Sequence, residues 1–149
     1  MKYRFENHDF VTERRSQLID LTTDVLEAVE RSDVKNGVAV VFSPHTTCAI
    51  LINEAEDGFF CDFGEMLDRL VPSGTYYRHD DLSVRTQGLE EDTALYPNGH
   101  SHCRSSILPS SQSIPVTDGR LALGQWQRIF FCELDRSRPR KVLIQVLGE

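Results

Sequence analysis

Two continuous runs of apolar, largely β-branched residues constrain this chain more than any other feature. Residues 38–43 read VAVVFS, and residues 48–53 read CAILIN. Runs of this length and composition predict buried strands, because a strand covered on both faces is apolar throughout. Only the polar residues 44–47 (PHTT) connect the two runs. The pattern therefore predicts a rigid sheet scaffold that carries a short polar tip.

Other segments predict further strands and two or three helices. We expect strands at residues 2–7, 18–21, 113–117, 120–123, 128–134 and 142–147, and helices at residues 22–32, 57–70 and 100–108. Apolar residues recur at spacings of three and four in the first two helical segments. Strands outnumber helices, and the last strands are consecutive. This order favours an α+β fold with a mainly antiparallel, barrel-like sheet over a doubly wound parallel sheet.

Length and composition indicate a single compact domain spanning residues 1–149. A chain of 149 residues with 40% hydrophobic and 26% charged residues excludes a disordered chain and a coiled coil. Sixteen basic and 23 acidic residues give a net charge of −7. This balance argues against nucleic acid as a partner, because phosphate contacts need clustered Lys and Arg.

The chain carries no sequence signal for a membrane. No run approaches the roughly 18 apolar residues that span a bilayer, and residues 1–10 lack the apolar core of a signal peptide. The four cysteines lie far apart without a CxxC pair, so we expect reduced thiols. These features predict a soluble, cytoplasmic protein.

Histidines are the first candidates for chemistry. His45 lies on the polar tip beside the hydroxyls of Thr46 and Thr47, where the buried strands would hold it rigidly. His79 is followed by Asp80 in a polar segment, residues 72–98, that is long for a compact domain. A carboxylate beside a histidine can orient the ring. The alternative for each histidine is a structural or surface position.

A second histidine pair lies at His100 and His102. In a strand the two rings would share a face, whereas in a helix they would point apart and only one would serve a site. With His45 and His79, either of them would complete a three-histidine metal site. Zinc accepts three protein ligands and keeps one position open for water or substrate.

Glu133 interrupts an apolar strand, IFFCELD. Such a carboxylate either points to solvent by alternation or is a partly buried acid, and we expect the solvated orientation. The glycine-rich phosphate loops GxxxxGK[ST] and GxGxxG are absent, and so is the GxSxG nucleophile elbow. The sequence therefore argues against nucleotide binding of those types and against an α/β-hydrolase.

Short segments along nearly the whole chain carry a further resemblance. They are residues 45–47 (HTT), 51–54 (LINE), 79–80 (HD), 101–102 (SH), 105–106 (SS), 114–116 (IPV), 118–121 (DGRL), 123–127 (LGQWQ), 131–135 (FCELD) and 148–149 (GE). In this order they resemble the YjbQ-like family, also called secondary thiamine-phosphate synthase enzymes. Two features depart from the family: the segment 81–99 is longer than in simpler members, and His100 is an extra imidazole.

The resemblance implies a fold, an assembly and a site. The fold is a compact α+β domain around a barrel-like sheet, and the assembly is a homotrimer. His45, His79 and His102 are implied to converge on a metal, with His102 rather than His100 as the third ligand. Glu133 falls where the family places an acid, which makes it a candidate to line the site.

The family name implies thiamine-phosphate synthesis from hydroxymethylpyrimidine diphosphate and thiazole phosphate, with release of pyrophosphate. Pyrophosphate chemistry usually needs Mg²⁺ and arginines around the leaving group, and Arg78, Arg104 and Arg128 are available. Three imidazoles, however, suit Zn²⁺ better than Mg²⁺. The synthase activity is therefore expected to be weak or secondary.

Two alternatives use the same site. The first is a metal-dependent hydrolase in which Glu133 or Asp80 acts as the base on a metal-bound water. The second is a non-catalytic trimer that binds a metal or a small ligand. In each case we expect Thr46, Thr47, Asn53 and Arg104 to contact the small molecule.

Overall fold

Two antiparallel sheets form around the two apolar runs, with one run in each sheet. The computed structural model describes residues 1–89 and 97–149, which contain eight strands and three helices. In chain order they are β1 (Lys2–Val11), β2 (Leu18–Asp20), α1 (Thr22–Ser32), β3 (Gly37–Phe42), β4 (Cys48–Asn53), α2 (Asp57–Leu70), α3 (Gly99–Ile107), β5 (Ser111–Thr117), β6 (Arg120–Leu121), β7 (Arg128–Glu133) and β8 (Pro139–Gly148). The predicted segments are confirmed with small shifts, the largest at β1, which continues four residues beyond the prediction.

The larger sheet has the strand order β1-β8-β3-β5-β6, and the smaller sheet has the order β2-β7-β4. Every strand pair among the described residues is antiparallel, and one sheet curls into a half-barrel. The predicted α+β fold with mainly antiparallel sheets is therefore confirmed. The strands β3 and β4 do not pair with each other, so the polar tip crosses from one sheet to the other.

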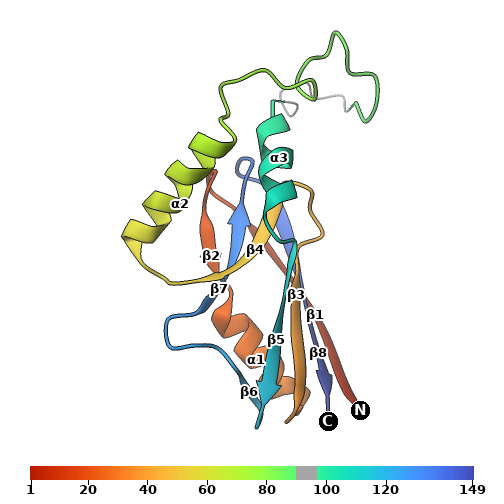
Figure 1. Ribbon diagram of the computed structural model, residues 1–149. Helices are drawn as coiled ribbons and strands as arrows, with labels where there is room; N and C mark the ends of the chain where they lie inside the picture. Colours follow the sequence, from red (N-terminus) through yellow and green to blue (C-terminus); the bar gives the residue numbers. More distant parts are fainter. Residues whose placement is uncertain (90–96) are drawn as a thin grey trace.

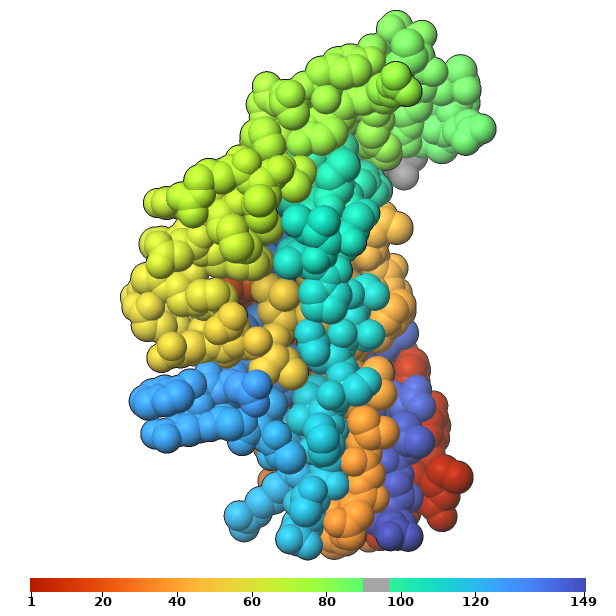
Figure 2. All heavy atoms as spheres, in the orientation of Figure 1, coloured from red at the N-terminus to blue at the C-terminus, as the bar shows by residue number. Residues whose placement is uncertain are grey.

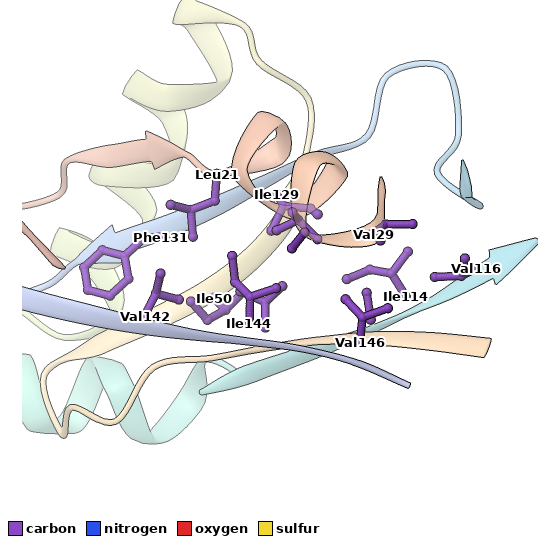
Figure 3. Packing of buried hydrophobic residues seen from close by; sticks show 14 of the residues in the cluster. Leu21, Val29, Ile50, Ile114, Val116, Ile129, Phe131, Val142, Ile144 and Val146 are labelled. Carbon is purple, nitrogen blue, oxygen red and sulfur yellow. The ribbon is translucent and has the colours of Figure 1, made fainter. Parts of the chain in front are cut away.

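The hydrophobic core lies between the two sheets and α1. Figure 3 shows aliphatic side chains from both sheets meeting there, with Val142, Ile144 and Val146 of β8 facing Ile129 and Phe131 of β7. The even-numbered residues of β8 point inward, as the two-residue period of a strand requires. A second, smaller cluster around Leu67 packs α2 against the smaller sheet.

The two ends of the molecule differ. Both termini lie at one end, where the first residues of β1 pair with the last residues of β8 (Figure 1). The tip between β3 and β4, the start of α3 and the residues that follow α2 lie at the other end. Among the described helices, none is long and apolar enough to cross a membrane.

Candidate functional site

A cavity of about 350 Å³ opens where the tip, α3 and the start of β8 meet. The residues that follow α2 project over this end of the molecule in Figure 2, and we call residues 76–89 the overhang. The lining residues come from four separate parts of the chain. They are Pro44, His45, Thr46, Thr47, His79, Arg85, Gly88, Asn98, His102, Arg138 and Arg140.

His45 extends from the tip and is held by a backbone donor. The N–H of Lys141 donates a hydrogen bond of 2.9 Å to its Nε2, and the ring lies edge-on to Phe131 with 6.4 Å between centroids. Burial, followed by the charge of Arg140, lowers the pKa of His45 below its usual value. The imidazole is therefore neutral at pH 7, with its proton on Nδ1.

His79 of the overhang and His102 of α3 lie side by side on the cavity wall, with 4.4 Å between their ring centroids. Nε2 of His79 is 3.0 Å from Oδ1 of Asn98 and 3.2 Å from Nη1 of Arg85. Burial, followed by the proximity of His79, lowers the pKa of His102. His102 is therefore neutral at pH 7 and able to accept a proton.

Three arginines that were not predicted from the sequence reach the cavity. Arg85 comes from the overhang, where its Nη1 also donates to the carbonyl oxygen of His79 at 3.1 Å. Arg138 and Arg140 come from the turn before β8 and from its second residue. Arg138 pairs with the buried carboxylate of Asp135 at 3.1 Å. These guanidinium groups make the cavity wall cationic.

Glu133 lies fully buried beneath Arg140. Nε and Nη2 of Arg140 donate to its two oxygens at 2.6 and 2.7 Å. The hydroxyl of Thr12 and the N–H of Asp135 donate at 2.8 and 2.9 Å, and Nη2 of Arg140 also reaches Thr47 Oγ1 at 3.1 Å. The predicted solvated orientation of Glu133 is wrong, because residues 129–133 of β7 are all buried, so alternation brings none of their side chains to solvent.

The contacts of Glu133 fix Arg140 rather than reach a substrate. Its two oxygens are occupied, and it does not line the cavity. Although burial opposes the charged form, the hydrogen bonds and charge of Glu133 raise the pKa of Arg140. In the structure Glu133 therefore holds a charged guanidinium in place, and its predicted role as a base is still a prediction.

Asp80, the other predicted base, holds the beginning of α3. Its Oδ1 accepts the N–H groups of Asn98 and Gly99 at 3.0 and 2.8 Å, an arrangement favoured at the positive end of a helix dipole. Asp80 does not line the cavity. Its role in the structure is to tie the overhang to α3, which sets His79 opposite His102.

The predicted substrate-binding residues divide between the cavity and other regions. Thr46 and Thr47 line the cavity. Asn53 lies at the opposite end of β4, about 17 Å along the strand from Cys48, and lines a groove beside α2. The structure therefore does not bring Asn53 to the histidines.

The three arginines that the sequence suggested for pyrophosphate also lie elsewhere. Arg104 is fully buried on α3 and donates to Asp68 of α2 at 2.6 Å. Arg128 pairs with Asp20 at 2.8 Å. Arg78 lines a separate hollow formed by the overhang itself. None of the three lines the histidine cavity.

Helix α3 turns its two imidazoles in different directions, as predicted for a helix. His102 lines the cavity, whereas His100 is 2% exposed and lies 3.1 Å from the hydroxyl of Ser101. Burial, followed by the charges of Arg15 and Arg104, lowers the pKa of His100 to about 4. His100 is therefore a buried neutral residue outside the cavity.

Comparison with known proteins assigns the family. Residues 6–149 match the profile of the family described as UPF0047 protein YjbQ-like. The chain belongs to the YjbQ-like family. The resemblance of its short segments to this family is thereby confirmed.

Relatives of this YjbQ-like chain are spread among archaea and bacteria. The UPF0047 protein of Archaeoglobus fulgidus is 39% identical over 136 residues, which cover 91% of this chain and 95% of that protein. The UPF0047 protein of Methanothermobacter thermautotrophicus is 40% identical over 138 residues, covering 93% and 87%. The names of both relatives identify a family and no reaction.

Solved structures of YjbQ-like proteins share the fold. A YbjQ-like protein of unknown function from Sulfolobus solfataricus superimposes with a TM-score of 0.82 at 29% identity, covering 99% of both chains. A YjbQ/UPF0047 family protein from Clostridium acetobutylicum gives a TM-score of 0.81 at 36% identity, covering 95% of this chain and 99% of that one. Chemistry must therefore be inferred from the site.

The histidines of this YjbQ-like chain fit a metal only in part. Among residues 1–89 and 97–149, no three His, Cys, Asp or Glu side chains are grouped to hold a metal ion. Nε2 of His45 accepts the Lys141 N–H, and its Nδ1 carries the remaining proton, so neither nitrogen offers a free lone pair. His79 and His102 remain as a pair of adjacent imidazoles.

A signal for two of the cavity arginines was present in the YjbQ-like sequence. Residues 135–140 read DRSRPR, three arginines within five residues of an acidic chain. Local clusters of basic residues mark anion sites, and this cluster directly follows the strand that carries Glu133. Arg85 and Asn98 lie in a segment without periodicity, where the sequence offers no comparable signal.

Proposed function

We propose that this chain is an enzyme that binds a phosphate-bearing small molecule in the histidine–arginine cavity. The observation that carries the proposal is the lining itself, which holds three arginines, three histidines and, among residues 1–89 and 97–149, no acidic side chain, in a chain of net charge −7. Guanidinium groups bind phosphate oxygens through paired N–H donors. The hydroxyls of Thr46 and Thr47 and the amide of Asn98 supply neutral donors beside them.

The reaction that we propose first is thiamine-phosphate synthesis. The bond between the pyrimidine methylene carbon and the diphosphate oxygen breaks, and pyrophosphate leaves with the electron pair. The ring nitrogen of thiazole phosphate then forms the new C–N bond. Arg85, Arg138 and Arg140 would stabilise the charge that develops on the leaving group. Mg²⁺ would enter with the diphosphate, because it is commonly bound through substrate phosphates.

The test is pyrophosphate release from the two precursors. We expect the wild type to release one pyrophosphate per thiamine phosphate formed, and Arg85→Ala or His102→Ala to abolish most of this turnover. Arg78→Ala is the matched control, because Arg78 lies in the same overhang and does not line the cavity. A silent wild type would contradict the synthase reaction. Calorimetry with inorganic pyrophosphate measures anion binding independently of turnover.

A metal-dependent hydrolase is a second candidate, favoured by the 4.4 Å separation of the His79 and His102 rings. We propose zinc for this alternative, since imidazole suits zinc better than magnesium. His79 and His102 would hold the ion, and His45 would join them only after releasing the Lys141 N–H. Bound zinc would supply Lewis-acid chemistry for attack on a phosphoester.

Metal content measured by mass spectrometry tests this candidate. The samples are the native protein and a triple variant, His45→Ala, His79→Ala, His102→Ala. About one zinc per chain, lost in the variant, would support a histidine metal site. A metal-free protein that also fails to take up added zinc would contradict it. Zinc uptake without turnover of any phosphoester would instead support a non-catalytic binding protein.

We also propose that the chain acts as a homotrimer in the cytoplasm, with a small molecule as its ligand and neither nucleic acid nor membrane as a partner. The family resemblance supports the trimer, and the acidic balance of the chain supports the absence of nucleic acid. Sedimentation equilibrium tests the trimer directly. A mass of one chain, 17.0 kDa, would contradict it.

A further inference from the structure

Asp135 is a buried carboxylate that the proposed chemistry does not use. Its side chain is 1% exposed and does not line the cavity. Its oxygens lie 3.1 Å from Nε of Arg138 and 3.3 Å from Nε of Arg136, and Nδ2 of Asn98 donates to its Oδ2 at 3.1 Å. Two of these neighbours, Arg138 and Asn98, belong to the cavity wall. Asp135 is therefore placed to act on the cavity through the residues that it holds.

The carboxylate of Asp135 fixes the orientation of the Asn98 amide. An ionised carboxylate only accepts hydrogen bonds, so the amide must turn its NH₂ group towards Asp135. The reverse orientation would bring two oxygen atoms together at a buried position and leave both without a donor. With Nδ2 on Asp135, Oδ1 of Asn98 faces the ring of His79.

Nε2 of His79 has two neighbours that make opposite demands on it. Oδ1 of Asn98, at 3.0 Å, can only accept a hydrogen bond and therefore requires a proton on Nε2. Nη1 of Arg85, at 3.2 Å, can only donate and therefore requires a lone pair there. A neutral imidazole has one proton to place, so both demands cannot be met. Arg85 has a second acceptor, the carbonyl oxygen of His79 at 3.1 Å, whereas the amide of Asn98 is held by Asp135.

We infer that Asp135 is a positioning residue that decides this competition and sets the tautomer of His79. Acting through Asn98, it places the proton of neutral His79 on Nε2 and the lone pair on Nδ1. The hydrogen bond made by one ring nitrogen determines what the other nitrogen can do. A proton or a metal ion that neutral His79 accepts must therefore bind at Nδ1.

His45, on the same cavity, has the opposite tautomer. Its Nε2 accepts the N–H of Lys141 at 2.9 Å, so its proton is on Nδ1. Nδ1 is thus a donor in His45 and an acceptor in His79. Two such rings can serve one ligand differently, because the first donates to an oxygen atom while the second accepts a proton. This use of the two rings rests on the proposed function, whereas the tautomers do not.

The test is NMR of the protein labelled with ¹⁵N-histidine, which distinguishes protonated from bare ring nitrogens, with His79→Gln to assign the His79 signals. At about pH 8, where ordinary imidazoles are neutral, we expect His79 as the Nε2–H form and His45 as the Nδ1–H form. Asn98→Leu removes the acceptor and leaves Arg85 beside Nε2, so His79 is expected to change to the Nδ1–H form. His45 is the internal control and keeps its tautomer in every sample.

Asp135→Asn tests the positioning role itself. The new side chain donates as well as accepts, so it no longer forces the Asn98 amide into one orientation. We expect the Nδ1–H form of His79 to rise from below about 10% to roughly half, because a hydrogen bond to a charged group shifts an equilibrium about tenfold or more. Asp68→Asn is the matched control, since Asp68 pairs with an arginine that does not line the cavity. This control is expected to give the wild-type spectrum.

Each outcome decides the inference. Wild-type His79 in the Nδ1–H form would overturn it, because Arg85 would then control the ring. A His79 ring that stays in the Nε2–H form in Asn98→Leu would also overturn it, since Asp135 acts only through that amide. Reversal in Asn98→Leu without any change in a folded Asp135→Asn would overturn the role of Asp135.

The fold and the proposed function are checked separately. Circular dichroism shows whether each variant is folded. Asn98→Leu leaves Asp135 with its two arginines, so it keeps the inference falsifiable if Asp135→Asn misfolds. The NMR measurement needs no ligand, whereas pyrophosphate release needs both precursors. A silent enzyme with the expected tautomers would therefore contradict the synthase reaction alone.

Discussion

Arg140 and Arg104 are both buried arginines, yet their surroundings give them different roles. Arg140 is held by the fully buried carboxylate of Glu133, and its side chain forms part of a cavity wall. Arg104 is held by Asp68, whose side chain is 67% exposed, and joins α3 to α2 away from that cavity. Burial of an arginine is therefore a poor guide to function. A buried partner and an open cavity together distinguish the first from the second.

Removing the carboxylate beneath Arg140 is the strongest test of the difference between the two arginines. We expect Glu133→Ala to destabilise the fold by about 3–5 kcal/mol, because it leaves a buried guanidinium without a counterion. Urea unfolding measures this loss. Asp68→Ala is the matched control at the other arginine and should cost far less. Equal losses of stability in the two variants would contradict the different roles assigned to Arg140 and Arg104.

Side-chain periodicity explains how much of the fold could be predicted. The apolar pattern that predicts β4 (residues 48–53) or α2 (residues 57–70) lies entirely within that one segment. Both elements begin and end where expected. Which strands pair with each other could not be predicted from such local patterns. Strands β3 and β4 follow each other in the chain but belong to different sheets, because their registers are set by distant partners such as β8 and β7.

The histidines of the candidate site could be predicted from the sequence, whereas its arginines could not. The structure brings His45, His79 and His102 around one cavity, and the role of these histidines as metal ligands is still a prediction. The orientation of Glu133 could not follow from alternation, since residues 129–133 of β7 are buried on both faces. Arg85 lies in an aperiodic segment, so its position depends on tertiary contacts that no local pattern encodes.

His100, whose pKa is lowered by burial and in part by the charge of Arg104, predicts that the stability of the fold depends on pH. The pKa of His100 is about 4 in the folded state against an unfolded value of about 6.5. The unfolded chain therefore binds a proton first as the pH falls, and stability is lost between about pH 6.5 and 4. The full loss is about 3 kcal/mol. We expect His100→Gln to flatten this part of the stability profile relative to the wild type.

Arg104→Met refines this pH experiment. The charge of Arg104 contributes to the low pKa of His100, so its removal should narrow the pH window in which stability is lost. The same variant should leave pyrophosphate binding unchanged, because Arg104 does not line the cavity. A profile identical in the wild type and in His100→Gln would contradict the assignment of the pH dependence to His100.

Arg140→Lys tests the other half of the comparison. Lysine keeps the positive charge of Arg140. It lacks the planar guanidinium group, which binds Glu133 through two nitrogens and also lines the cavity. We expect about a 10- to 100-fold weaker affinity for inorganic pyrophosphate, measured by calorimetry, as bidentate geometry is lost. Arg104→Lys is the matched control, and its affinity should equal that of the wild type. A reduced affinity in the control alone would reverse the roles assigned to the two arginines.

Asp68→Asn should produce the smallest effect. Asp68 is largely exposed, and ion pairs with an exposed partner contribute about 1 kcal/mol or less. Nε and Nη2 of Arg104 also donate to the carbonyl oxygen of Val71 at 3.0 and 2.8 Å, so the guanidinium keeps an acceptor after the substitution. Urea unfolding should therefore give a loss of about 1 kcal/mol, reduced further by salt. A loss as large as that of Glu133→Ala would mean that Asp68 supports the buried charge of Arg104 as Glu133 supports Arg140.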